Sequence, residues 1–367
     1  MRSDAATEWR HEATLTATAP EAGAEFGAAI ALAAGDPSIA AIGAPRADVL
    51  GHFDAGCVEI FQRETHPRSP APSHAPTGTA RGFRARPSMR SADDGSSDAA
   101  REPDVRWRRI ATVRSEDPQA SAWFGRAIAT DGRWLAIGAP GTDVPRAGDV
   151  GMSVGVVFLY RIEPQAVVPV ATIVPPTPTR SMWFGSALAI DDGLLLVGAP
   201  GAEIAAGPAD RGEGTRAGLA FLYELAAFAG GPGDPPHGAP LVLAPPSIEA
   251  GAGFGQSVAL GAGLAVVGAP GTDGQRIAPD GTILPIEDAG QSVLFALPWR
   301  GSTGAGGALD PLDTLAGPSE LPMALFATQA TITTLRPGGP VFTATGHLYV
   351  EEEAYGPSPG VALHRVR

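Results

Sequence analysis

Four acidic side chains recur in the sequence at one fixed offset from a repeated tripeptide. Each lies five residues after the glycine of a Gly-Ala-Pro motif, and the four are Asp48, Asp143, Glu203 and Asp273. If each copy folds in the same way, the four carboxylates lie on one face. They could form an anionic collar that holds a cation or a basic partner. Alternatively, each carboxylate accepts backbone N–H bonds and closes a turn.

The other residues that could carry chemistry show no catalytic or zinc-binding pattern. None of the seven histidines has a zinc-type spacing to another His, Cys or acid. The single cysteine, Cys57, excludes an internal disulfide and is expected to be a small core residue at the start of a strand. Asp191 and Asp192 are adjacent, so we expect them in a β-turn with side chains that point apart. We therefore predict no catalytic residue and no enzyme activity.

Composition favours a chain of many short strands. The 367 residues include 48 Gly and 36 Pro, and 44% are hydrophobic. The net charge of −13 argues against a nucleic-acid partner, because phosphates attract a basic face. No run approaches the roughly 18 apolar residues that a membrane span needs. The first 20 residues contain no apolar segment typical of a signal peptide.

A longer unit surrounds each Gly-Ala-Pro tripeptide. A Phe-Gly pair precedes the tripeptide, and the distance from Phe to the tripeptide's Gly is 14 residues in three copies and 17 in the first. The pairs are Phe26-Gly27, Phe124-Gly125, Phe184-Gly185 and Phe254-Gly255. The tripeptides run from Gly43 to Pro45, Gly138 to Pro140, Gly198 to Pro200 and Gly268 to Pro270. Each copy predicts a strand, a tight turn and a second strand that the proline ends.

Two further strands complete each copy. We expect third strands at 57–62, 156–162, 219–225 and 293–297, and outer strands at 107–113, 167–173, 240–243 and 313–315. A fifth, degenerate copy occupies 326–332, 341–346 and 360–366. Self-similarity at a nearly fixed period indicates a repeat architecture. An alternative is a sandwich of independent hairpins, which does not explain the recurring motif.

The predicted fold is all-β: a five-bladed β-propeller of four-stranded blades over residues 9–367. We expect strand 9–15 to pair with strand 360–366 and to close the ring, which leaves no open sheet edge. In the first strand of a copy, bulky residues such as Phe184 and Leu188 alternate with small ones such as Gly185. The face with bulky side chains should therefore pack against the small-residue face of the neighbouring blade. The glycine beside Phe should allow the two backbones to approach closely.

Three segments interrupt the repeats. Residues 63–106 are rich in Arg, Pro and Ser and have almost no apolar periodicity, so we predict a disordered insert within the first blade. The loops at 201–217 and 271–289 are long and acidic. Long loops on a rigid scaffold commonly carry function. They could equally be solvated insertions.

The Phe-Gly and Gly-Ala-Pro pairs resemble the FG-GAP repeat, the unit of the integrin α-subunit propeller and of many bacterial surface proteins. The short copies are more similar to the bacterial form. The resemblance implies an extracellular or cell-envelope setting. In that family calcium often sits in a DxDxDG loop between the first two strands. Here those loops, at 34–38, 131–133, 191–193 and 261–263, lack three alternating oxygens, so the calcium role does not carry over.

We accordingly expect a non-enzymatic binding or adhesion module with no evident cofactor. Its loop face would take a protein or carbohydrate ligand. Two alternatives remain open: a propeller scaffold for a carbohydrate-active or hydrolytic enzyme, and a structural fragment of a larger surface protein. A convergent acid–base pair in the two long loops would favour the enzyme.

Overall fold

The chain folds almost entirely into β-strands. The computed structural model describes residues 11–33, 38–66, 104–146, 149–204, 215–228, 239–280 and 282–297, and five short strands beyond residue 300. Within these residues the only helical element is a 3-10 turn at Leu225–Phe228. The all-β prediction is therefore confirmed for the described chain.

The main strands form five sheets of antiparallel strands, and each sheet comes from one stretch of the sequence except for one short strand added to the third. The first sheet contains β1 (Ala29–Ala33), β2 (Ile39–Ala44), β3 (Cys57–His66) and β4 (Asp104–Val113). The second contains β5 (Ala127–Thr130), β6 (Trp134–Ala139), β9 (Val156–Glu163) and β10 (Ala166–Ile173). The third contains β11 (Ala187–Asp191), β12 (Leu194–Ala199), β15 (Leu219–Glu224) and β16 (Leu241–Leu243), with β22 (Ala308–Leu309) added in parallel.

The last two sheets come from the C-terminal third of the chain. The fourth contains β17 (Ser257–Gly261), β18 (Leu264–Ala269), β21 (Gln291–Ala296) and β23 (Asp313–Ala316). The fifth contains β24 (Gln329–Thr334), β25 (Val341–Gly346) and β26 (Val361–Arg365). These strands agree with the predicted degenerate fifth copy: β24 and β25 pair Gln329 with Gly346 just as the third sheet pairs Ala187 with Gly198.

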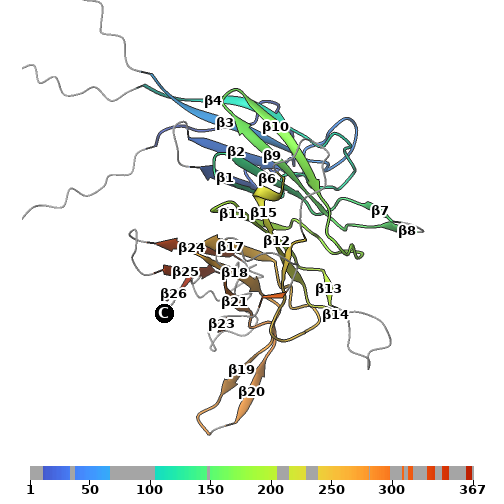
Figure 1. Cartoon of the computed structure of the whole chain (residues 1–367), viewed down its shortest axis with the longest axis vertical. Coiled ribbons are helices and arrows are strands. Elements are labelled where there is room, and N and C mark those ends of the chain that lie inside the picture. The colour runs from blue at the N-terminus through green and yellow to red at the C-terminus, as the bar shows by residue number, and fades with distance from the viewer. Residues whose placement is uncertain are drawn as a thin grey trace, which may run out of the picture.

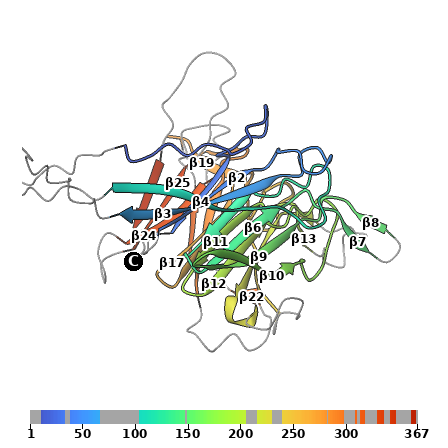
Figure 2. The ribbon, with the colours of Figure 1, turned by 90° about the horizontal axis from the view of Figure 1, so that it is seen from above.

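The five sheets stack in chain order, as blades of a propeller do. The first strands β1, β5, β11, β17 and β24 contact one another in that sequence. Figure 1 shows the first sheets above and the last sheets below, and Figure 2 shows the stack from above. Each sheet therefore has a front, which faces the preceding sheet, and a back, which faces the next one. In the first sheet Ile30 lies on the front and Gly43 lies on the back.

The Phe-Gly pairs do not lie inside the first strands, where the sequence analysis placed them. In the third sheet, β11 begins at Ala187, three residues after Phe184. The preceding residues form a turn in which Gly185 has a φ of 87°, a left-handed value that favours glycine. The Gly185 N–H donates to the Gly198 carbonyl at 3.0 Å, so the two motifs of one copy are joined directly.

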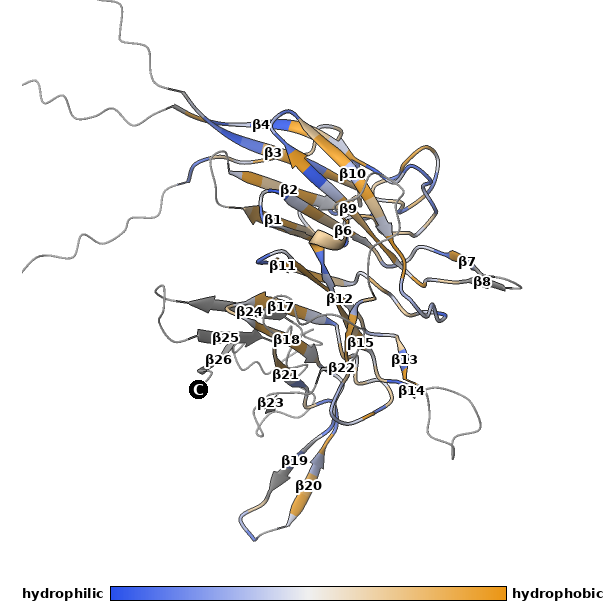
Figure 3. Cartoon of the chain, in the orientation of Figure 1, coloured by the Kyte–Doolittle hydropathy of each residue, from blue (hydrophilic) through white to orange (hydrophobic). Residues whose placement is uncertain are grey.

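Apolar side chains fill the space between successive sheets. Between the second and third sheets, Leu159 and Trp134 on one side meet Phe184, Leu195 and Phe221 on the other. Comparable clusters lie between the first and second sheets and between the third and fourth. Figure 3 shows the apolar residues concentrated along these strands. Stacking is thus the main source of buried apolar surface, as expected for repeats that cannot bury a face alone.

The two glycines of the motif are where neighbouring sheets approach most closely. A Cβ atom on Gly138 of the second sheet would overlap the carbonyl oxygen of Gly185 in the third sheet. The same relation joins Gly43 to Gly125 and Gly198 to Gly255. The prediction that the glycine beside Phe allows close backbone approach is therefore confirmed, and its partner is the glycine of the preceding Gly-Ala-Pro.

The predicted insert at 63–106 is shorter than the sequence suggested. Residues 63–66 extend β3 and residues 104–106 extend β4, with Arg63 opposite Trp107 and His66 opposite Asp104. These strand ends are hydrophilic (Figure 3), so the lack of apolar periodicity hid them. Charged pairs such as Arg108 with Glu64 support pairing without a core. The rest of the insert, 67–103, lies outside the described residues.

The predicted strand at 9–15 is wrong where the structure describes it. Residues 11–15 form no strand and do not pair with β26; they cross the front of the first sheet instead. Leu15 packs near Ile42 and Phe61, and Glu59 accepts hydrogen bonds from the N–H and the hydroxyl of Thr18, both at 3.0 Å. The alternation of polar and apolar residues alone could not distinguish a strand from an extended segment that packs across a sheet.

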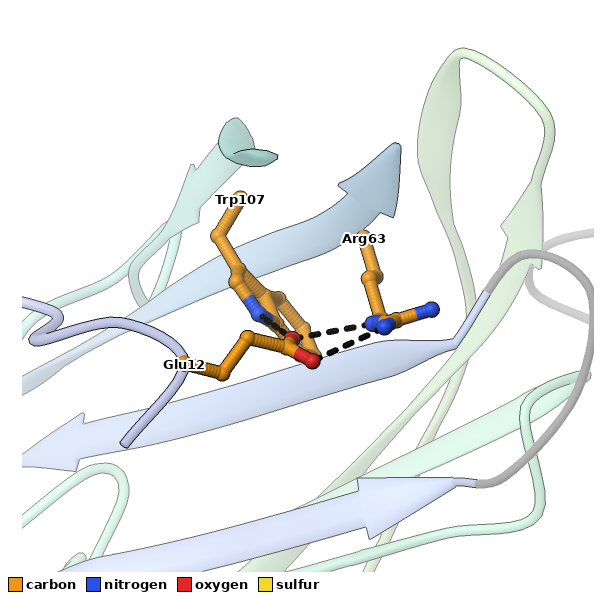
Figure 4. Close-up of polar contacts among 3 residues, drawn as sticks. All are labelled: Glu12, Arg63 and Trp107. Atoms are coloured by element: carbon orange, nitrogen blue, oxygen red, sulfur yellow. Dashed lines mark hydrogen bonds and ion pairs between the residues drawn. The ribbon is translucent and has the colours of Figure 1, made fainter. Parts of the chain in front are cut away.

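Glu12 fixes this segment to the outer strands (Figure 4). Its carboxylate accepts two hydrogen bonds from the Arg63 guanidinium, at 2.9 and 2.8 Å, and one from Trp107 Nε1 at 2.7 Å. The hydrogen bonds from Arg63 and then Trp107 lower the pKa of Glu12 from its ordinary 4.5 to about 2. Glu12 is therefore charged in the folded state at neutral pH.

This pKa predicts how the stability depends on pH. A lowered folded-state pKa gives a contribution that is present above pH 4.5 and is lost as the pH falls toward 2. Solvent screens this pair, so we expect its contribution to be small. The melting temperature of Glu12→Gln should lie below that of the parent at pH 6, and the difference should vanish near pH 2. A difference that persists unchanged at pH 2 would contradict this assignment.

Candidate binding face

Three of the four recurring acids close the loop that follows their Gly-Ala-Pro. Asp48 Oδ1 accepts from the Asp54 N–H at 3.1 Å, and Asp273 Oδ1 accepts from the Asp288 N–H at 3.0 Å. In the second sheet Asp143 Oδ1 accepts from the Ser153 N–H at 2.7 Å. Each carboxylate therefore bridges the base of its own loop, as the turn-closing interpretation requires.

Glu203 occupies the same position but has a different partner. Its carboxylate pairs with Arg216 at 3.3 Å across the short hairpin of β13 (Glu203–Ile204) and β14 (Thr215–Arg216). The longer side chain reaches across the strands instead of back to a loop N–H. The substitution of Glu for Asp thus changes the contact while it keeps a charge at the loop base.

A second set of polar residues, which the sequence analysis missed, holds the recurring acids from the other side. The backbone N–H groups of Asp48, Asp143 and Asp273 donate to side-chain oxygens at 3.1, 2.8 and 3.0 Å. The acceptors are Glu21, Gln119 and Glu249. Each acceptor stands five residues before the Phe of its copy, and that fixed offset could have revealed the set.

The fourth sheet gathers three carboxyl groups by this arrangement. Burial raises the pKa of Glu249, and the nearby charges of Asp273 and Asp288 raise it further, against a lowering by the Asp273 N–H. Within the described ranges, no three His, Cys, Asp or Glu side chains come together as a metal site. The structure places each recurring acid in its own loop, and the cation collar stays a prediction.

The acceptor role of Asp143 can be separated from its charge. Asp143→Ala leaves the Ser153 N–H without its partner and should lower the free energy of unfolding by about 1–2 kcal/mol. Asp143→Asn keeps an oxygen at the same place and should cost less than about 0.5 kcal/mol. Urea denaturation of both variants measures the two losses in the free energy of unfolding. Equal losses would show that the charge, not the acceptor, is what the loop needs.

Calcium titration by calorimetry tests the collar on the same variants. A collar predicts heats with the parent protein that disappear in Asp143→Asn/Asp273→Asn. Identical heats from both proteins would leave these acids with the turn-closing role alone. Because exposed charges are screened, collar binding should also weaken above about 0.15 M salt.

Hairpins extend from this same edge in three consecutive sheets (Figure 1). Each is inserted between the second and third strand of its sheet and begins at the recurring acid or directly after it. They are β7–β8 (Val144–Arg146, Asp149–Gly151), β13–β14, and β19–β20 (Gly274–Ile277, Ile283–Ile286). The described parts of the predicted long loops at 201–217 and 271–289 therefore include paired hairpin strands. We call this edge, with its loops and hairpins, the hairpin face.

Large apolar side chains are exposed on the hairpin face. In the first sheet, Leu50 and Phe53 in the loop after β2 are 82% and 72% exposed. Met152 occupies the place of Phe53 in the second sheet, and Ile283 lies on β20; both are also exposed. Clustered exposed apolar residues with a polar rim mark interaction sites more often than scattered ones.

Two tryptophans add local backbone strain to this face. Trp123 and Trp183 directly precede the Phe of their copies and have φ values of 55° and 53°. The fourth sheet has Gly253 at this position, with a φ of 65°. A left-handed conformation costs a residue with a Cβ roughly 1–2 kcal/mol, which glycine avoids. Trp183 is exposed, so this cost is not offset by full burial of its ring.

The remaining residues singled out in the sequence stand apart from this face or serve the fold. Asp192 and Gly193 form the two-residue turn between β11 and β12, with φ values of 47° and 77°, so the expected β-turn is confirmed. Cys57 begins β3 and is half-buried, and burial raises the pKa of its thiol. His11 contacts Thr14.

Comparison with known proteins agrees with the motif. Residues 107–160 match the sequence model of the FG-GAP repeat. The chain therefore contains an FG-GAP repeat. The matched segment runs from β4 through β9, so the sequence repeat starts with the outer strand of one sheet and continues into the next. Among curated proteins no sequence matches the chain.

Solved structures give only distant similarity to this FG-GAP repeat protein. A KlAtg21 structure, in complex with the coiled coil of AgAtg16, has a TM-score of 0.33 at 10% identity; the match covers 79% of this chain and 57% of that one. A putative 6-phosphogluconolactonase from Bacteroides uniformis has a TM-score of 0.23 at 11% identity, covering 74% and 96%. Scores this low do not define the fold. In the described part of the chain, no helix is long and apolar enough to span a membrane.

Proposed function

We propose that this FG-GAP repeat protein is a non-enzymatic binding or adhesion module that engages a partner through its hairpin face. The supporting observation is the alignment of three hairpins at one edge of consecutive sheets, beside the exposed Leu50, Phe53 and Met152. The five sheets act as five blades that hold this face rigid. The FG-GAP repeat favours a secreted or cell-surface setting, since such repeats are typical of extracellular proteins.

The chemistry of the face favours a protein partner with apolar and basic side chains. Exposed Phe and Met residues provide adaptable apolar contacts. The recurring acids and the net charge of −13 favour a basic partner over an acidic one and speed its approach. A carbohydrate ligand is the other outcome, with Trp123 and Trp183 as stacking surfaces.

Peptide and glycan arrays probed with the full chain test this proposal. The parent should bind basic, apolar peptides, and Phe53→Ser/Met152→Ser should lose at least about tenfold in affinity, because central apolar anchors carry most binding energy. Leu32→Ser removes a comparably exposed apolar side chain from the front of the first sheet, and at low protein concentration it should bind as the parent does. Binding to glycans but not to peptides would show that the ligand is a carbohydrate and not a protein. Equal binding by all three proteins would overturn the proposed face.

A further inference from the structure

The front of the first sheet has the features of a sheet-to-sheet interface, but none of the described sheets packs against it. Ile30 and Leu32 on β1 are each 65% exposed, whereas Ile128, the counterpart of Ile30 in the second sheet, is 8% exposed. Phe26 is half-buried, although the equivalent Phe124 is fully buried. The first sheet therefore presents the same apolar surface that its successors bury.

Glycine packing shows the same difference. A Cβ atom on Gly125 would lie 2.8 Å from Val58 Cγ2 and 3.0 Å from the Cys57 oxygen, both in the preceding sheet. At Gly27, the corresponding glycine of the first sheet, nothing lies within 4 Å. The backbone at the two sites is alike, with φ values of 97° at Gly27 and 90° at Gly125. Gly27 therefore has the backbone conformation that allows a neighbouring sheet to approach closely, although no described residue lies against it.

Three backbone N–H groups of the first sheet also lack the carbonyl acceptors that their counterparts in the later sheets have. In the second sheet the N–H groups of Ser121, Trp123 and Phe124 donate to the loop carbonyls of residues 53–55 in the first sheet, at 2.8, 3.1 and 3.0 Å. The third sheet repeats this contact with the second. In the first sheet the equivalent N–H groups belong to Gly23, Glu25 and Phe26, and the described chain offers them no backbone acceptor. These three N–H groups have the spacing that, in the second sheet, pairs with three consecutive carbonyls in the loop of the preceding sheet.

The described part of the N-terminal segment covers β3, β4 and part of β2 on this front, where Leu15 packs near Ile42 and Phe61. Residues 12–18 contact β3 and β4 through Arg63, Trp107 and Glu59. The inner part around β1 stays open, and this is where the glycines bring neighbouring sheets closest. What fits there is the back of another sheet of this repeat: a glycine-lined surface with loop carbonyls beside it.

Among the described sheets, the fifth is the one whose back has no following sheet against it. The backs of the first four sheets are taken by the sheets that follow them. In the fifth sheet, Gly346 holds the register position of the Gly-Ala-Pro glycine, and no described strand follows on its far side. In the same chain β24 packs against β17 and β18, and β1 packs against β2 and β5. The predicted closure of the ring within one chain is therefore not what covers Ile30 and Leu32 here.

The geometry points to front-to-back self-association: the open front of the first sheet receives the fifth sheet, β24–β26, of a second copy. Front and back are different surfaces, so the contact is heterologous, and two copies joined at both ends form a closed two-fold ring. This inference does not depend on the hairpin face, which lies on another edge of the sheets. It assigns the front of the first sheet as the oligomer interface.

Light scattering coupled to size-exclusion chromatography, over a range of protein concentrations, tests this interface. The parent should show a mass that rises from one copy to two. Ile30→Glu should stay monomeric to concentrations at least about 100-fold higher, because an unpaired charge would be buried in the contact. Ile283→Glu is the matched control: Ile283 is 60% exposed on the β19–β20 hairpin, so this variant should associate as the parent does.

Crosslinking identifies the partner surface. A photoreactive residue at position 30, in a mixture of unlabelled and nitrogen-15-labelled protein, should give mixed-isotope crosslinks to residues 329–346. Same-isotope crosslinks to that segment with no mixed-isotope crosslinks beside them would show closure within one chain and would overturn the proposal. A parent that is monomeric at every concentration, or an Ile30→Glu variant that associates like Ile283→Glu, would also overturn it.

Discussion

Replacing Gly138 with alanine is expected to lower the free energy of unfolding by about 3 kcal/mol or more, or to prevent folding. Gly138 lies in β6 with an ordinary extended backbone, so the new methyl group causes no strain in φ. The methyl group would instead overlap the carbonyl of Gly185 in the third sheet. Both atoms belong to rigid backbone, so the only relief is to separate the two sheets and lose apolar contact between them.

Urea denaturation followed by circular dichroism measures this effect. Gly263→Ala serves as the control, because Gly263 has a φ of 75° and nothing within 4 Å of its added Cβ. That change should cost only about 1–2 kcal/mol, the strain of a left-handed conformation. A Gly138→Ala protein that unfolds at the same urea concentration as the parent would show that the sheets do not meet at these glycines.

Replacing Phe184 with alanine is expected to cost about 3–5 kcal/mol. Phe184 is fully buried between the second and third sheets. Its ring lies edge-to-face against Phe221 at 5.6 Å and against Tyr223 at 6.4 Å between centroids. Removal leaves a cavity that strands fixed by hydrogen bonds cannot close.

Phe26→Ala is the matched variant for this prediction. Phe26 holds the same position in the first sheet but is half-buried, so its truncation should cost about 1–2 kcal/mol, in proportion to the smaller area removed. The comparison is made at low protein concentration, where self-association does not cover Phe26. Equal losses from the two variants would mean that the Phe-Gly motif acts within its own turn and not between sheets.

Much of the architecture followed from the repeated motif alone. The Gly-Ala-Pro tripeptides end β2, β6, β12 and β18, and strand VFTATG of the degenerate copy was found at its observed bounds of 341–346. Such positions are predictable because a proline or a glycine has a local effect on the backbone. The exception was the Phe-Gly pair itself, whose alternation with Leu188 suggested a strand although Gly185 has a left-handed conformation.

Features that depend on contacts between distant segments were not predictable in the same way. The crossing of residues 11–18 over the first sheet rests on Glu12, Thr18 and the buried Glu59. Glu59 stands where the second sheet has Phe158, which packs on Phe124 at 5.1 Å. An acid in place of this aromatic residue was visible in the sequence, but its partner became clear only from the fold.

The candidate binding face was predicted in outline and not in detail. The fixed offset of Asp143 and its counterparts placed the loops on one edge, while their ordered hairpins had no signal in the acidic, Gly-rich sequence. Glycines that start the third strands also escaped notice. A Cβ on Gly155 would overlap the Phe184 backbone, so these glycines belong to the same contact between sheets.

The comparison of Gly125→Ala with Gly27→Ala tests most directly whether the Phe-Gly and Gly-Ala-Pro motifs exist to bring sheets together. Both glycines have nearly the same φ, so the backbone strain is shared, and only Gly125 has a sheet against it. In urea denaturation at low protein concentration, Gly125→Ala should lose about 2 kcal/mol more than Gly27→Ala, because overpacking adds to the strain. Equal losses in the two variants would contradict the account.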